Sequence, residues 1–320
     1  MKKVFCCLAL IPLYLSCEME LNIEIPDSPP QLVVSSTLVP WTENPKYLGI
    51  EVYSSSHIFD ETEKTPIDNA TVIVYRDGQL FGQLNYLSEN DYNFYPMGFS
   101  PLKGPLPGEL YRVKVSAPDY ESVWAETIIP AKIEITDCQI DRVGYFDDNG
   151  TVFSRVTLSF NDPAQQTNYY EIVVSDILCQ YESFCYRRLT TNESFITSEA
   201  YYPTPVNPGL PNPTRLLFRD DTFDGQKASV NFYYFPHQKL ADNTIYLYEG
   251  YVVVQLRHIT EDYYKHYTTK QQARNFMTTD ILYGGGEPIN VYSNVNNGLG
   301  IVAGFNSSLF VMELDGLYIP

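Results

Sequence analysis

The sequence has few of the residues that carry catalysis or bind metals. It contains only four histidines, two tryptophans and six cysteines in 320 residues. The motifs of an activated serine, a zinc-binding helix, a phosphate-binding loop and a dinucleotide-binding turn do not occur. His258 and His266 flank the start of an expected helix, where surface or packing roles are commoner than a metal pair. We therefore expect a protein that is not an enzyme and has no cofactor, with a hydrolase of unrecognised site as the alternative.

Positive charge is also scarce. Lysine and arginine number 21 against 39 aspartates and glutamates, which gives a formal net charge of −18. Nucleic acids and anionic lipid surfaces carry negative charge, so this balance argues against both as partners. Acidity of this kind is common in secreted proteins, and it does not by itself identify a cationic ligand.

Long apolar runs are absent after the first 15 residues. Lys2 and Lys3 precede the apolar stretch Val4–Leu15, which is too short to span a bilayer and has the form of a signal peptide. The stretch ends in Ser16 and Cys17, and a small residue before a cysteine is what a lipoprotein signal peptidase requires. We expect residues 1–16 to be removed and Cys17 to be lipidated, with residues 17–30 as a tether. Cleavage as an ordinary signal peptide nearby is the alternative.

Three cysteines remain after the lipidation site: Cys138, Cys179 and Cys185. The odd number leaves one unpaired. Cys179 and Cys185 could close a short loop by a disulfide in an oxidising compartment. A metal site at these cysteines is not expected, because no histidine lies nearby at a ligand-like spacing.

Residues 31–130 show the alternation of apolar and polar residues that is typical of strands. Tyrosine is abundant, with 27 copies, and favours half-buried strands. Asp77 and Gly78 carry the signal of a tight hairpin between two such runs. We expect a small Ig-like or prealbumin-like β-sandwich here. The segment around Asn69–Val72 and the strand from Leu110 resemble the prealbumin-like or carboxypeptidase-regulatory-like sandwich.

Residues 131–320 are expected to form a second, β-rich domain with one helix. The helix is predicted from Thr260, a suitable N-cap, to about Phe276, with Glu261 and Asp262 in its first turn. The fold class is therefore all-β with a single helix.

Two groups of residues are candidates for binding. Asp220, Asp221 and Asp224 form the densest cluster of oxygen ligands, although turn chemistry explains them better than calcium, and no metal is expected overall. Tyrosine rings can stack on sugars or bury against proteins, although ordinary packing is the commoner role. The candidate binding surface consists of Tyr201, Tyr202, Tyr263 and Tyr264.

Several segments together resemble the domain of unknown function 4249 family, which are outer-membrane lipoproteins of Bacteroidota. They include Phe218–Gly225, the helix start Ile259–Tyr267 and the segment Glu287–Ile301, in which Asn294–Gly300 reads as a turn between strands. The acidic residues after Cys17 also resemble the surface-export signals of such lipoproteins. The family contributes no catalytic residues.

The resemblance implies a location and a partner. Such proteins are typically encoded beside TonB-dependent receptors, which implies a lipid-anchored accessory protein on the exterior of the outer membrane. Its expected partners are the membrane, a receptor β-barrel and a nutrient ligand, glycan or peptide. An adhesion or structural surface protein is the alternative.

Overall fold

The computed structural model describes residues 29–40, 49–56, 66–84, 104–178, 184–197, 214–241, 244–279 and 289–319. The chain divides into Met1–Pro30 and Gln31–Pro320, and all elements belong to the second unit. The elements are β1 (Leu32–Leu38), β2 (Ile50–Ser54), β3 (Thr71–Arg76), β4 (Gln79–Leu84), β5 (Leu110–Ser116), β6 (Val123–Ile128), β7 (Ile135–Phe146), β8 (Val152–Asn161), β9 (Tyr169–Leu178), β10 (Phe184–Tyr186), β11 (Leu189–Thr190), β12 (Arg215–Arg219), β13 (Lys227–Tyr234), β14 (Gln238–Ala241), β15 (Thr244–Leu247), β16 (Gly250–Ile259), α1 (Glu261–Thr279), β17 (Leu299–Leu314) and β18 (Leu317–Ile319).

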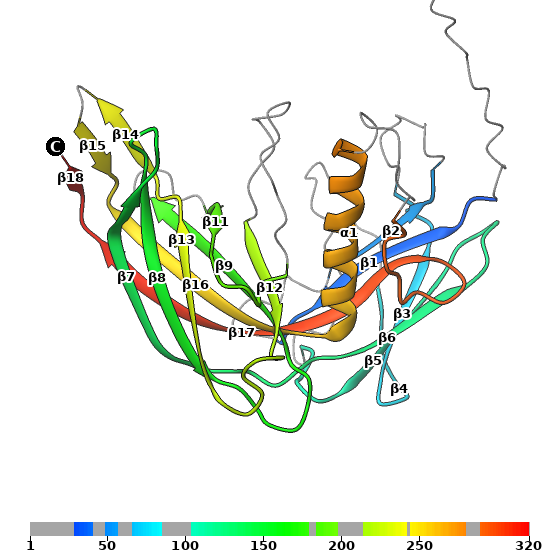
Figure 1. Cartoon of the computed structure of the whole chain (residues 1–320). Helices are drawn as coiled ribbons and strands as arrows, with labels where there is room; N and C mark the ends of the chain where they lie inside the picture. Colours follow the sequence, from blue (N-terminus) through cyan, green and yellow to red (C-terminus); the bar gives the residue numbers. More distant parts are fainter. Residues whose placement is uncertain are drawn as a thin grey trace, which may run out of the picture. The chain divides into compact units, whose positions relative to one another are not determined.

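The strands form four sheets. A seven-stranded sheet runs in the order β10-β9-β16-β17-β1-β2, with β12 paired to β9 (Figure 1). Two four-stranded sheets have the orders β4-β3-β5-β6 and β11-β13-β8-β7. The fourth sheet is three-stranded, in the order β14-β15-β18. The alternating sequence patterns produce these strands because buried apolar residues recur at every second position.

Strand β17 belongs to both halves of the seven-stranded sheet. Its residues 299–304 pair with β1 in parallel, and its residues 305–314 pair with β16 in the antiparallel sense. Gly300 permits the first pairing: its φ is +111°, and a Cβ there would lie 2.0 Å from the carbonyl oxygen of Val34. The sequence therefore needs glycine at this position for steric reasons.

Two hydrophobic cores lie against this long sheet. One joins residues of β3, β5 and β6 to those of β1, β2 and β17, including Val74, Val113 and Val302. The other joins residues of β8 and β13 to those of β9 and β16, including Leu158, Phe232 and Val254. Each core is the interior of a two-layer β-sandwich.

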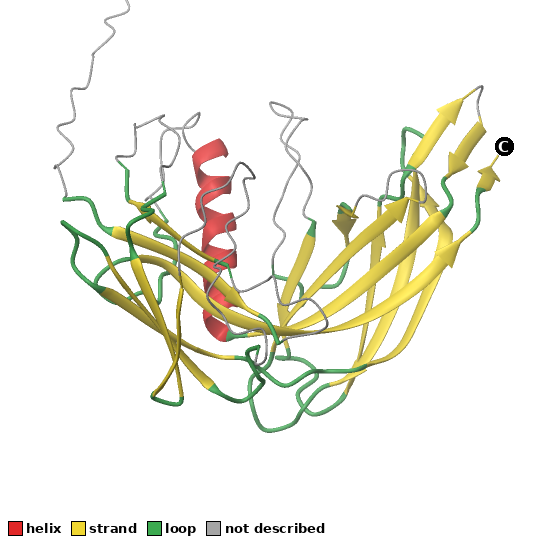
Figure 2. Ribbon diagram, turned by 180° about the vertical axis from the view of Figure 1, so that it is seen from behind, coloured by secondary structure: helices red, strands yellow, loops and turns green. Residues whose placement is uncertain are grey.

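The helix α1 packs on the seven-stranded sheet through a smaller apolar cluster (Figure 2). Thr260 caps its N-terminus, because its Oγ1 accepts a hydrogen bond from the amide of Tyr263 at 3.3 Å. The predicted cap is confirmed, and the helix extends three residues beyond the predicted end. Among the described residues, no helix combines the length and the apolar character that crossing a membrane would take.

The predicted turns are confirmed in two places. Asp77 and Gly78 both have positive φ, +47° and +77°, as a two-residue hairpin turn requires. In the segment predicted as a turn before β17, Asn294 Oδ1 accepts a hydrogen bond from the amide of Val302 at 3.0 Å. Asn294 Nδ2 donates to the carbonyl of the same residue at 2.8 Å. Asn294 thereby extends the hydrogen bonding of β17 with a side chain.

The fold class, all-β with one helix, is confirmed. The boundary near Pro130 falls between β6 and β7, but the sheet of the first half is completed by β17, from the end of the chain. Residues Gln31–Pro320 also group as one compact unit. The division into domains of residues 31–130 and 131–320 stays a prediction.

We expect a protein of residues 31–320 to unfold cooperatively in urea. We expect a fragment of residues 31–130 not to do so. The fragment lacks β17, so one side of β1 loses its hydrogen-bonding partner, and the core loses Val295 and Val302. Far-ultraviolet circular dichroism during urea unfolding of both proteins checks this. A sigmoidal transition of the short fragment would show that the first sandwich is an independent domain.

Candidate functional site

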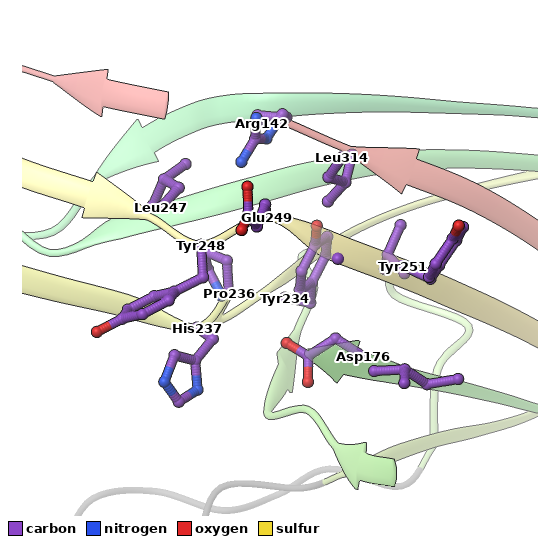
Figure 3. A pocket seen from close by; sticks show the side chains of 13 residues that line it. Arg142, Asp176, Tyr234, Pro236, His237, Leu247, Tyr248, Glu249, Tyr251 and Leu314 are labelled. Atoms are coloured by element: carbon purple, nitrogen blue, oxygen red, sulfur yellow. The ribbon is translucent and has the colours of Figure 1, made fainter. Parts of the chain in front are cut away.

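A pocket lies where several strands of the second sandwich end. It encloses about 350 Å³ of space, including open solvent at its mouth. We call it the strand-end pocket (Figure 3). Its lining residues are Arg142, Asp176, Ile177, Tyr234, Pro236, His237, Leu247, Tyr248, Glu249, Gly250, Tyr251, Val252 and Leu314.

The pocket exists because two strand connections bend at the same end of the sandwich. Pro236, which cannot donate to a ladder, follows the end of β13 and places His237 before β14. Gly250 has a φ of +146° and marks the break between β15 and β16. Tyr248 lies in this break and is partly buried, whereas Tyr251, the second residue of β16, is exposed.

Aromatic rings form much of the pocket wall. The ring of His237 meets the ring of Tyr248 edge-on, with centroids 4.6 Å apart. Tyr246 extends this group, 5.1 Å from Tyr248 and 4.6 Å from Tyr318. Figure 3 shows His237 and Tyr248 next to each other, with Tyr251 on the opposite side. Tyr251 is 40% exposed.

Charges of both signs border the same space. Asp176 is paired with Arg187, both side chains being 12% exposed, and Arg187 Nη2 lies 3.4 Å from His237 Nδ1. Glu249 is exposed, and Arg142 donates from Nη1 to the carbonyl of Asp315 at 2.5 Å. The pocket therefore offers donors and acceptors around an aromatic wall.

This arrangement offers contacts to a ligand. The carboxylate of Asp176, one of two acidic residues in the lining, is directed toward Arg187 by an ion pair. Rings with convergent polar groups are typical of sites that bind a sugar or a peptide side chain.

The structure contradicts the predicted tyrosine surface at one residue, Tyr263. Tyr201 and Tyr202 lie outside the described residues. Tyr263 is 3% exposed and belongs to the cluster between α1 and the sheet, so its assignment to a binding surface is wrong. Tyr264 is partly buried, and its hydroxyl lies 2.6 Å from Thr197 Oγ1. The two tyrosines at the helix start therefore hold the helix on the seven-stranded sheet. The helical repeat of 3.6 residues per turn places Tyr263 on the side of the helix that faces this sheet.

Tyr263 is part of a buried charge network. The carboxylate of Glu171, in β9, is fully buried and accepts from Arg257 Nη1 at 2.6 Å and from the Tyr263 hydroxyl at 3.1 Å. Arg215 Nη1 lies 3.2 Å from the same carboxylate. Burial alone would lower the pKa of Arg257, but the charge of Glu171 raises it above its usual value. The network joins β9, β12, β16 and α1, and its role is structural.

The structure brings two of the three calcium candidates together and separates the third from them. Asp220 and Asp224 meet Asp162, with one oxygen of each within 4.8 Å of the others, whereas Asp221 pairs with Arg219 at 2.6 Å. Asp221 is therefore not part of the cluster. Burial, and then the charges of Asp220 and Asp224, raise the pKa of Asp162.

The three clustered carboxylates already have hydrogen-bond donors. Asp162 accepts from the Tyr170 hydroxyl and from the amide of Gly225, and Asp220 accepts from the amide of Asn168 at 2.8 Å. Asp224 accepts from the amide of Gln165 at 3.1 Å. These bonds are what the turn interpretation expects. Calcium at Asp220 and Asp224 stays an untested alternative.

The cysteines and histidines are placed as follows. Cys17 and Cys179 lie outside the described residues, and of Cys185 only the backbone, in β10, is described. Cys138 is free, and burial raises the pKa of its thiol to about 12, which makes it unreactive. The Nδ1 atoms of His258 and His266 contact the carbonyls of Ala131 and Tyr292, so both rings have packing roles.

Sequence reasoning did not find the strand-end pocket. It assigned no function to His237, Tyr248 or Tyr251. The available signal was the aromatic run Tyr246, Tyr248 and Tyr251 around a glycine, directly after Pro236 and His237 in the preceding connection. That signal identifies a bend but not the residues it brings together.

The substitution Glu171→Gln is expected to lower the free energy of unfolding by about 3 kcal/mol, because it leaves two arginines without their buried counter-charge. Urea unfolding measures the change. Glu121→Gln, on an exposed residue, is the control and should change it by about 0.5 kcal/mol or less. Equal effects of the two substitutions would contradict a structural role of the network.

Comparison with known proteins identifies one family. The family model described as Domain of unknown function (DUF4249) matches residues 18–309. No curated protein and no solved structure matches the chain. The match covers the tether, both sandwiches and the helix, so the chain belongs to the DUF4249 family.

Proposed function

We propose that this protein is a non-catalytic accessory lipoprotein, held on the outer face of a Bacteroidota outer membrane, that binds a nutrient ligand for a TonB-dependent transporter. The observation that carries the binding role is the strand-end pocket, with its aromatic wall and charges of both signs. The pocket is small and open to solvent, so it would contact only one end of a longer ligand.

The location rests on the sequence of the first unit. Lys2 and Lys3, the apolar stretch and Ser16–Cys17 together favour export and lipidation. The family match begins at residue 18, directly after the proposed new N-terminus. Acyl chains on Cys17 would hold the protein at the membrane, since each buried methylene contributes about 0.8 kcal/mol.

A ligand bound at the cell surface would have to be transferred from this protein to the transporter. A small open pocket binds a ligand but does not carry it across a membrane, so uptake needs a second protein. The proposal of a TonB-dependent receptor rests on the family resemblance and not on the geometry of the pocket.

The pocket is tested with the substitution Tyr248→Ala. Arrays of glycans and short peptides first identify a ligand of the purified protein. Removal of the ring should weaken its binding at least tenfold, about 1.4 kcal/mol, because aromatic side chains dominate such contacts. Isothermal titration calorimetry measures the loss. Trp124→Ala is the control, since Trp124 is an exposed ring on the other sandwich. Equal affinity of wild type and Tyr248→Ala would place the ligand elsewhere.

The anchor and the partner are tested with the substitution Cys17→Ala. The variant should lose palmitate labelling, leave the outer-membrane fraction and no longer co-purify with a β-barrel receptor from detergent extracts. Cys7→Ala is the control and should behave as wild type. Recovery of wild-type protein from the outer membrane without any receptor, in repeated preparations, would reject the partnership while leaving ligand binding intact.

A further inference from the structure

We propose that the free edge of strand β17, at residues 309–313, binds an extended segment of a partner protein by strand addition, and that this segment alternates basic and apolar residues. The inference goes beyond the proposed ligand binding and does not depend on the strand-end pocket. It rests on the pairing of β17, on the exposure of its side chains and on the charges beside it.

In the described part of the chain, β17 has partners on both sides for only part of its length. Residues 299–304 lie between β1 and the side chain of Asn294, but residues 305–314 pair with β16 alone. The side of β17 opposite β16 is therefore an open edge beyond the end of β1. An open edge offers amide and carbonyl groups to another strand.

The hydrogen bonds show which groups face the open edge. The carbonyl of Gly304 accepts from the amide of Thr260 at 3.0 Å, on the side of β16. Backbone groups alternate between the two sides of a strand, so the even-numbered residues face β16. Leu309, Val311 and Glu313 then direct their amides and carbonyls away from β16.

The open stretch has defined ends. At one end Ser308 Oγ donates to the carbonyl of Ile133 at 2.6 Å and to Glu134 at 3.2 Å. At the other end Arg142 donates to the carbonyl of Asp315. Six residues, 309–314, lie between these contacts, about 20 Å of strand at roughly 3.4 Å per residue.

Within the described part of the chain, this edge lacks the bulges that usually protect an edge strand. The neighbouring edge strand β7 has two register shifts, near Asp137 and after Asp141, and bulges of this kind prevent regular pairing. Strand β17 pairs with β16 without interruption. Its side chains Leu309 and Val311 are 57% and 56% exposed on one face. A regular edge with exposed apolar residues is suited to strand addition.

The charges select the occupant. Glu313 belongs to the edge itself. Asp315 follows one end of the edge beside Arg142, and Glu134, at the other end, is already paired with Lys132 at 3.0 Å. A second copy of the chain would bring the same acidic residues and a net charge of −18 to this place, which disfavours self-pairing. A segment with basic residues at alternate positions complements the acidic groups, and its apolar residues cover Leu309 and Val311.

The probe for this site is a capped eight-residue peptide of alternating valine and lysine, with a fluorescent label. Fluorescence anisotropy measures its binding, and amide hydrogen exchange locates it. Binding should be saturable and should slow exchange at Leu309, Val311 and Glu313 at least tenfold. The same peptide with alternate amides methylated, and a peptide of valine and glutamate, should each bind at least tenfold more weakly.

Two substitutions separate backbone pairing from unfolding. Val311→Pro removes an amide that faces away from β16, and Val311→Lys adds a positive charge without changing the backbone. Both should weaken binding of the valine-lysine peptide at least tenfold. Leu240→Lys, on an exposed residue of β14, is the control and should change binding less than twofold. If Val311→Pro loses its circular dichroism spectrum, Val311→Lys decides.

Three results would overturn the proposal. The first is absence of binding by the valine-lysine peptide, and the second is binding without slowed exchange at residues 309–313. The third is a dimer of the free protein, seen by light scattering, that Val311→Lys dissociates, since that would make a second copy the occupant of the edge.

Discussion

The pairing of β17 with two strands, one on each side and at different points along its length, is the constraint on which the rest of the structure depends. The parallel ladder to β1 closes the first core, and the antiparallel ladder to β16 closes the second. The parallel ladder needs the backbone of β17 to pass close to Val34, and Gly300 is the residue that permits this approach. The last described part of the chain therefore completes a core that its first strands begin.

The helix depends on β17 and on the charge network below it. α1 begins directly after β16, and Thr260 bonds both to the helix and to Gly304 of β17. Tyr263, in the first turn of the helix, donates a hydrogen bond to Glu171, which is also paired with two arginines. A helix with so few apolar residues gains little from hydrophobic burial, so these polar contacts fix its position on the sheet. Their cost is the desolvation of Glu171 and of most of Arg257, which the ion pairs and the Tyr263 hydrogen bond offset.

The features that the sequence predicted are those set by neighbouring residues. The alternation in β5, the Asp77–Gly78 hairpin and the cap at Thr260 each depend on a few consecutive positions. The family also followed from short segments. The strand-end pocket did not, because its lining residues come from β7, β9, β13, β15, β16, β17 and two connections. Tyrosine was ambiguous for a related reason: Tyr263 is buried and Tyr251 is exposed, and only the three-dimensional position separates them.

The pocket and the open edge share one structural support. Tyr251 lines the pocket, and its hydroxyl lies 3.3 Å from a carboxylate oxygen of Glu313, which lies on the edge. The two residues are also directly opposite in the ladder of β16 and β17. Any contact that orders Glu313 therefore acts on a ring of the pocket, and any ligand that moves Tyr251 changes the hydrogen bond at the edge. A ligand and an added strand would meet across a single residue pair, so their binding free energies are coupled wherever both are present.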